Sequence, residues 1–168
     1  MRLYLLRHAL AVPHGTPGFR NDADRPLTRE GQTQARQVAE GLRRLKLEPE
    51  LILTSPCRRA VQTAEAAARA LGTRLDELPE LRPGTPPSAT TLALKPFTGR
   101  GDLLLVGHEP HLSDWLAELV AGPSGLRCVL KKGGAACVEV ERVLPPAAAG
   151  TLRWLLMPKQ LSLIGKAA

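Results

Sequence analysis

The sequence contains few aromatic residues, few cysteines and no long apolar run, and each scarcity argues against a class of protein. Phe, Trp and Tyr make up 3% of the 168 residues, which leaves few stacking platforms for single-stranded nucleic acid. The three cysteines form no C-x-x-C pair, which argues against a disulfide framework or a zinc knuckle. No apolar run approaches the roughly 18 residues of a membrane span, and no basic-then-apolar leader follows Met1. We therefore expect a soluble, cytoplasmic protein with no membrane partner.

Acidic residues are also fewer than basic ones. The sequence has 16 Asp and Glu and 23 Lys and Arg, which gives a formal net charge of +7. A surface of this kind favours anionic partners. No recognition motif or long Lys/Arg block accompanies the charge, so we expect no specific nucleic-acid binding. A phosphorylated protein or a small phosphorylated molecule fits the charge as well.

Apolar runs and amphipathic segments alternate along the first 120 residues. The runs at 2–6, 50–54 and 102–106 are typical of strands buried on both faces. Helical periodicity predicts a helix from Thr28 to about Leu45, and the pattern at 112–120 predicts another. The alanine-rich segment 57–72 has high helix propensity and ends at Gly72, a usual C-cap residue, so we expect a helix there too. The Pro- and Gly-rich segment 78–101 is expected to be mostly loop, with one short helix near 88–94.

The last third is richer in strand signals, at 126–130, 136–143 and 151–157, the last two joined by an alanine-rich connection. Strands that alternate with helices and then give way to further strands predict an α/β protein. We expect a single domain over 1–168, a three-layer αβα sandwich with a mostly parallel central sheet, helices on both faces and no large cap insertion.

Polar side chains follow the ends of the three predicted central strands: Arg7 and His8 follow the first, Arg58 and Arg59 the second, and His108 and His111 the third. In such sheets, ligands bind beyond the carboxyl ends of the strands, so these residues are expected to converge. Two Arg and two His make a poor metal site and a good tetrahedral-anion site. We expect no metal and no cofactor, and phosphoryl transfer to an imidazole nucleophile.

Four ordered motifs make the sequence similar to a known family: LLRHA at 5–9, LTREGQTQA at 27–35, TSPCRRAVQTA at 54–64 and LLVGHEP at 104–110. Together they resemble the histidine phosphatase superfamily, which includes the cofactor-dependent phosphoglycerate mutases. The resemblance implies that His8 is the catalytic nucleophile. It also implies that Arg7, Arg59 and His108 complete the catalytic site and bind the phosphate.

Many members of this family carry an acid in an L-x-E element that protonates the leaving oxygen. Here the comparable stretch places Pro83 at that position, although Glu80 and Glu77 lie close by in the sequence. With its missing acid and the short distance between the third and fourth motifs, the sequence resembles the SixA-type branch, whose members act as protein phosphohistidine phosphatases. Two alternatives stay open: a small-metabolite phosphomonoesterase or mutase that uses Glu80 or Glu77, and a phosphate-binding module without turnover.

Overall fold

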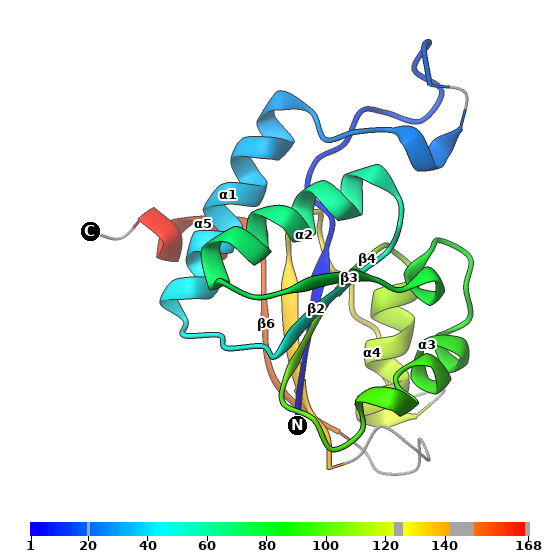
Figure 1. The fold of residues 1–168 in the computed structure, drawn as a ribbon, viewed down its shortest axis with the longest axis vertical. Helices are drawn as coiled ribbons and strands as arrows, with labels where there is room; N and C mark the ends of the chain where they lie inside the picture. The colour runs from blue at the N-terminus through cyan, green and yellow to red at the C-terminus, as the bar shows by residue number, and fades with distance from the viewer. Residues whose placement is uncertain (20, 123–125, 142–149, 167–168) are drawn as a thin grey trace.

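The centre of the structure is a mixed six-stranded sheet (Figure 1), seen in a computed structural model that describes residues 1–19, 21–122, 126–141 and 150–166. The strand order is β3-β2-β4-β1-β5-β6. The four parallel strands are β1 (Arg2–Arg7), β2 (Leu51–Thr54), β3 (Leu75–Glu77) and β4 (Leu103–Gly107). The antiparallel extension consists of β5 (Ala135–Glu139) and β6 (Thr151–Leu156). The mostly parallel sheet predicted from the sequence is therefore confirmed.

Helices cover both faces of this sheet, as predicted (Figure 1). One layer contains α1 (Arg29–Arg44), α2 (Arg58–Leu71) and α5 (Pro158–Lys166), and the other contains α3 (Pro87–Ala93) and α4 (His111–Ala121). Side chains of a strand alternate between the two layers. On β1, Tyr4 and Leu6 pack into the first layer, whereas Leu3 and Leu5 pack into the second. All four are at most 2% exposed, so β1 lies at the centre of both cores.

The described connections contain three single-turn 3-10 helices: η1 (Asp22–Asp24) before α1, η2 (Pro79–Leu81) after β3 and η3 (Lys95–Phe97) before β4. The short helix expected near 88–94 is present as α3. No helix in the described parts of the chain is both long and apolar enough to cross a bilayer.

The start of α1 fixes the path of the chain that leaves β1. Thr28 caps the helix, because its hydroxyl oxygen accepts a hydrogen bond from the Gly31 N–H at 2.9 Å. The Leu10 carbonyl accepts a hydrogen bond from the Thr28 N–H at 3.0 Å and lies directly against Gly31. A Cβ at Gly31 would overlap this carbonyl oxygen. The glycine of the LTREGQTQA motif is therefore required by a close approach of two backbones.

We expect Gly31→Ala to lower the free energy of unfolding by about 3 kcal/mol, because two main-chain segments must separate to admit the methyl group. Urea unfolding monitored by circular dichroism measures this change. Gln32→Ala is the matched control, since Gln32 is the next residue of the same helix turn and is exposed. A Gly31→Ala variant as stable as the control would show that the two segments separate without cost.

The segment 126–130, predicted as a strand, is not one in the structure. At Leu130 both backbone groups bond to side chains instead of a neighbouring strand. The Leu130 N–H donates to the Glu109 carboxylate at 2.9 Å, and the Leu130 carbonyl accepts from the Arg7 guanidinium at 2.8 Å. Apolar composition predicted a strand at this position, but tertiary hydrogen bonds determine the conformation of the segment.

Two elements were not predicted, and one prediction is only partly covered by the structure. The edge strand β3 has three residues, too few for a periodic signal, and α5 follows β6 with only Met157 between them. The predicted strand 136–143 corresponds to β5, although its residues 142 and 143 lie outside the described residues. The alanine-rich connection before β6 also lies outside them, except for Gly150.

Candidate active site

The strand ends bring the four predicted site residues to one edge of the sheet. Arg7 is the last residue of β1 and is paired with Gly107, the last residue of β4. His8 and His108 directly follow these strands, and the His8 N–H donates to the Gly107 carbonyl at 3.0 Å. The centroids of the two imidazole rings lie 5.0 Å apart. Arg59, in the first turn of α2, is close enough to lower the pKa of both histidines electrostatically.

The hydrogen bond made by His8 determines which of its ring nitrogens carries the proton. Nδ1 lies 2.7 Å from the Ala9 carbonyl oxygen, and a carbonyl can only accept, so Nδ1 is the protonated nitrogen. The lone pair of the neutral ring is therefore on Nε2. Burial, with a smaller contribution from Arg59 and Arg7, lowers the pKa of His8 to about 3 and outweighs the opposing effect of the Ala9 carbonyl. His8 is consequently an uncharged, oriented base near neutral pH.

His108 is held by the serine of the TSPCRRAVQTA motif. Its Nε2 lies 2.9 Å from Ser55 Oγ, which also accepts a longer hydrogen bond from the Cys57 N–H at 3.3 Å. Its Nδ1 is buried and has no partner among the described residues. Burial, followed by the His8 and Arg59 charges, lowers the pKa of His108 to about 2. This ring is therefore also neutral near pH 7.

Arg7 is anchored by the segment that precedes β5. One terminal nitrogen donates to the Leu130 carbonyl at 2.8 Å, and its Nε is buried with no partner in the described part of the chain. Burial lowers the pKa of the guanidinium, and the nearby Glu109 carboxylate opposes that shift. Glu109 also accepts from the Leu130 N–H and from the Ser113 hydroxyl. The same carboxylate therefore holds the N–H of Leu130, the residue whose carbonyl orients Arg7.

Arg59 is 3% exposed and bonded to a residue that sequence reasoning did not identify. Its Nη1 donates to the main-chain carbonyl of Asp22 at 2.7 Å, and its Nη2 donates to Oδ2 of the same residue at 2.8 Å. Burial alone would raise the pKa of the Asp22 carboxyl, but hydrogen bonds from His14, Arg25 and Arg59 hold it well below its usual range. Asp22 is thus a fixed negative charge at the edge of the cluster.

Two further motif residues tie the site to the helices. The Thr63 hydroxyl accepts from the Ala9 N–H at 3.1 Å and donates to the Arg59 carbonyl at 2.7 Å, so it links the end of β1 to α2. Gln34 accepts from the Leu10 N–H at 3.0 Å and donates to the Lys132 carbonyl at 3.1 Å. Both residues support the backbone around His8.

A hollow of about 440 Å³ borders the cluster through Asp22. It is lined by Asn21, Asp22, Ala23, Pro56, Cys57, Arg82 and Pro83. Pro83, at the position where the resemblance places an acid, is thus beside the cluster. Neither Glu77 nor Glu80 is among the described residues that line this hollow.

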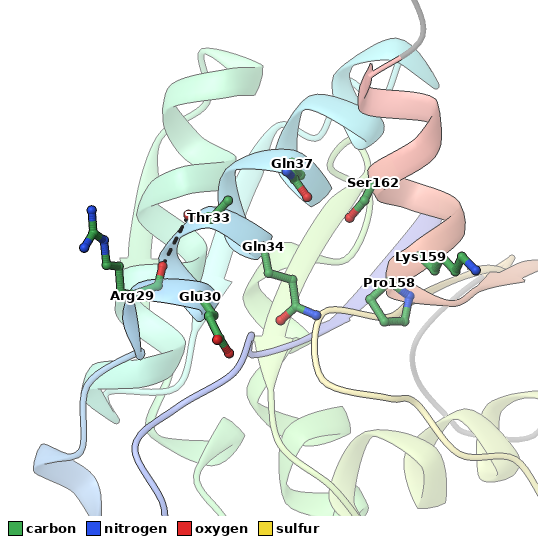
Figure 2. Close-up of a pocket in the computed structure, with 8 residues that line it drawn as sticks. All are labelled: Arg29, Glu30, Thr33, Gln34, Gln37, Pro158, Lys159 and Ser162. Carbon is green, nitrogen blue, oxygen red and sulfur yellow. Dashed lines mark hydrogen bonds between the residues drawn. The ribbon is translucent and has the colours of Figure 1, made fainter.

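A second and larger hollow, of about 730 Å³, lies away from these residues, between the first turns of α1 and helix α5. Figure 2 shows its lining side chains, among them Arg29, Gln34, Lys159 and Ser162. None of the four predicted site residues is among the described residues that line it. Volume alone would therefore point to a different part of the molecule from the sheet edge where the four predicted residues lie.

Known proteins are similar to this chain in both sequence and fold. Residues 3–83 match the family model of the histidine phosphatase superfamily, branch 1. An uncharacterised protein of Picosynechococcus sp. is 38% identical over 140 residues, which cover 80% of this chain and 82% of that protein. Phosphohistidine phosphatase SixA of Escherichia coli is 32% identical over 126 residues, covering 73% of this chain and 76% of SixA. The chain belongs to the SixA-type branch of the histidine phosphatase superfamily.

The fold of a SixA-type histidine phosphatase is confirmed by a solved structure. The protein histidine phosphatase SixA complexed with tungstate superimposes with a TM-score of 0.82 and 28% identity, covering 96% of this chain and 99% of that one. Membership of the superfamily supports phosphatase activity for this chain. The predicted resemblance and the phosphoglycerate mutase-like fold are therefore both confirmed.

Proposed function

We propose that this protein is a phosphohistidine phosphatase, which moves a phosphoryl group from a phosphorylated histidine of another protein to His8 and then to water. The observation that carries the proposal is the orientation of His8. Because its Nδ1–H donates to the Ala9 carbonyl, the lone pair of the neutral ring is on Nε2. Arg7, Arg59 and His108 surround this ring at the same sheet edge.

In the first step, His8 Nε2 attacks phosphorus and forms a P–N bond. The P–N bond to the substrate imidazole breaks on the opposite side, and its electron pair stays on the leaving nitrogen. The guanidinium groups of Arg7 and Arg59 stabilise the negative charge on the phosphoryl oxygens, which is where most of the acceleration arises. His108 adds a donor if its proton is on Nδ1, and the Ser55 hydroxyl, by donating to Nε2, favours that tautomer.

In the second step, a water molecule attacks the phosphorus of the His8 intermediate. A new P–O bond forms, and the electron pair of the breaking P–N bond returns to Nε2. The proton lost by the water passes to the released phosphate. His8 is then neutral again, with Nδ1 still bonded to Ala9, and no metal takes part in either step.

The surroundings of the cluster support a substrate that leaves without an acid. An alkoxide leaves slowly unless a proton donor assists it, whereas a phosphorylated imidazole with a proton on its other nitrogen leaves as a neutral ring. Asp22 is the carboxylate among the described residues that line the neighbouring hollow, and its lowered pKa keeps it ionised. It therefore has no proton to donate near neutral pH. SixA of Escherichia coli, which is named a phosphohistidine phosphatase, favours the same substrate.

The test is a comparison of turnover on three substrates in the presence of a metal chelator: a phosphohistidine peptide, an aryl phosphate and an alkyl phosphate such as a phosphoglycerate. We expect the phosphohistidine peptide to be hydrolysed fastest and the aryl phosphate weakly. The alkyl phosphate should be slower than the peptide by at least about 100-fold, the usual contribution of a general acid. Glu80→Gln and Glu77→Gln are the matched controls and should leave all three rates unchanged.

Other outcomes would favour the alternatives. Alkyl turnover equal to that of the peptide, with a bell-shaped pH profile lost in either Glu variant, would indicate a small-metabolite phosphomonoesterase or mutase. Binding of inorganic phosphate without hydrolysis of any substrate would indicate a binding module. Activity that disappears with chelator and returns with zinc would contradict the metal-free steps.

A further inference from the structure

Among the described residues, Asp22 is the one partner of the Arg59 terminal nitrogens, and it uses only part of the hydrogen-bonding capacity of the guanidinium. Asp22 accepts one N–H from Nη1 through its main-chain carbonyl and one from Nη2 through Oδ2. The Nε–H is buried and has no partner among the described residues. The guanidinium therefore keeps the Nε–H and a second N–H on each terminal nitrogen. The Nε–H and the adjacent Nη2–H form the fork that binds two oxygens of one phosphate.

Asp22 is itself fixed, so it can fix Arg59. Its Oδ1 accepts from Arg25 Nε at 2.8 Å and Nη2 at 2.6 Å, and from His14 Nδ1 at 3.0 Å. Arg25 also donates to the Val12 carbonyl, which ties η1 to the segment that follows His8. The Asn21 side chain caps η1 by accepting from the Ala23 N–H. The two oxygens of the carboxylate thus have different roles, because Oδ1 holds the loop and Oδ2 holds Arg59.

The burial of Arg59 makes this contact important for its orientation. The side chain is long and flexible, and a buried guanidinium without an acceptor is unfavourable, so an unrestrained Arg59 would turn toward water. The Asp22 contact keeps the cation at the cluster. The carboxylate also remains ionised as the pH falls, because its pKa is held well below the usual range.

We propose that Asp22 is a positioning residue that orients Arg59 so that its Nε edge faces the bound phosphoryl group. This inference rests on the proposed function, in which Arg59 binds phosphate. Asp22 acts on the reaction through Arg59 and not by touching the reacting atoms. A misplacement of about 1 Å in a catalytic site can cost about 100-fold in rate. We therefore expect Asp22→Ala to lower kcat/KM for an aryl phosphate by about 10- to 100-fold.

The experiment is a double-mutant cycle on aryl phosphate hydrolysis with wild type, Asp22→Ala, Arg59→Ala and the double variant. If Asp22 acts through Arg59, Asp22→Ala lowers the rate in the wild type and has no further effect in the Arg59→Ala background. A merely structural role would lower the rate in both backgrounds. Asp24→Ala is the matched control, since Asp24 is an exposed carboxylate of the same 3-10 helix η1, and it should stay within about twofold of wild type.

Two outcomes would overturn the inference. Faster turnover by Asp22→Ala would show that the carboxylate competes with the phosphate for Arg59, and equal losses in both backgrounds would show that it acts elsewhere. The affinity for inorganic phosphate, measured by calorimetry on the same four proteins, separates this inference from the proposed function. If no protein of the cycle hydrolyses any substrate, the proposed function fails. The phosphate affinities then still show whether the effect of Asp22 depends on Arg59.

Discussion

Replacing His8 with alanine is expected to abolish hydrolysis of every substrate, with a loss of at least about 10⁴-fold in kcat. The reason is chemical, because the proposed route passes through a P–N bond to this ring and no other described side chain is placed to form it. Among the described residues of the cluster, His108 is the other imidazole, and its Nε2 is bonded to Ser55. The two arginines carry no nucleophilic lone pair at accessible pH.

The His8→Ala protein should remain folded, because the lost side chain makes one hydrogen bond, to the carbonyl of the adjacent Ala9. Circular dichroism and the binding of inorganic phosphate check this, since Arg7 and Arg59 are unchanged. Rapid quenching of the wild type with labelled phosphohistidine peptide should trap an acid-labile phosphoprotein that the variant never forms. A folded His8→Ala protein with near-wild-type turnover would eliminate His8 as the nucleophile.

The stability of the protein is expected to fall steeply as the pH drops below about 6.5. Burial lowers the pKa values of His8 and His108 to about 3 and about 2, whereas both titrate near 6.5 in the unfolded chain. Between these values the unfolded state binds more protons than the folded state, so the free energy of unfolding decreases as the pH falls. From pH 7.5 to 5 the two rings together should remove about 4 kcal/mol.

Urea unfolding at a series of pH values measures this dependence, and a His8→Asn, His108→Asn double variant is its control. The variant should lose most of the slope between pH 7.5 and 5. Part of it will remain, because burial also lowers the pKa of His111. An unfolding free energy that is constant over this range in the wild type would mean that the two rings accept protons in the folded protein as readily as in the unfolded chain.

The central part of the fold could be predicted from sequence because its signals are local. Runs such as 2–6 and 102–106 are apolar on both faces, a pattern typical of strands covered on both sides and of buried helices. Because these runs are short, the pattern favours strands. Thr28 and Gly72 mark helix ends through capping, a short-range effect that each residue exerts on its own neighbours.

The missed features depend on contacts between distant residues. Asp22 lies 37 residues before Arg59, in a segment whose composition indicates only a loop, so nothing local marks it as the partner of a buried cation. The segment 126–130 has the composition of a strand but bonds to Glu109 and Arg7 instead. The arginine and histidine positions were predictable because the motifs specify them. Their supporting hydrogen bonds are visible only in the structure.

Arg7 is oriented by a residue that the ribosome adds much later. Arg7 leaves the ribosome well before its main-chain partner, Leu130, which lies 123 residues later in the chain. Leu130 in turn is ordered by Glu109, 21 residues before it. When all four motifs of a nascent chain have left the ribosome but the segment 126–130 has not, the chain still lacks the partner that orients Arg7. Arg7 therefore gains this orientation only after the segment that contains Leu130 has been synthesised.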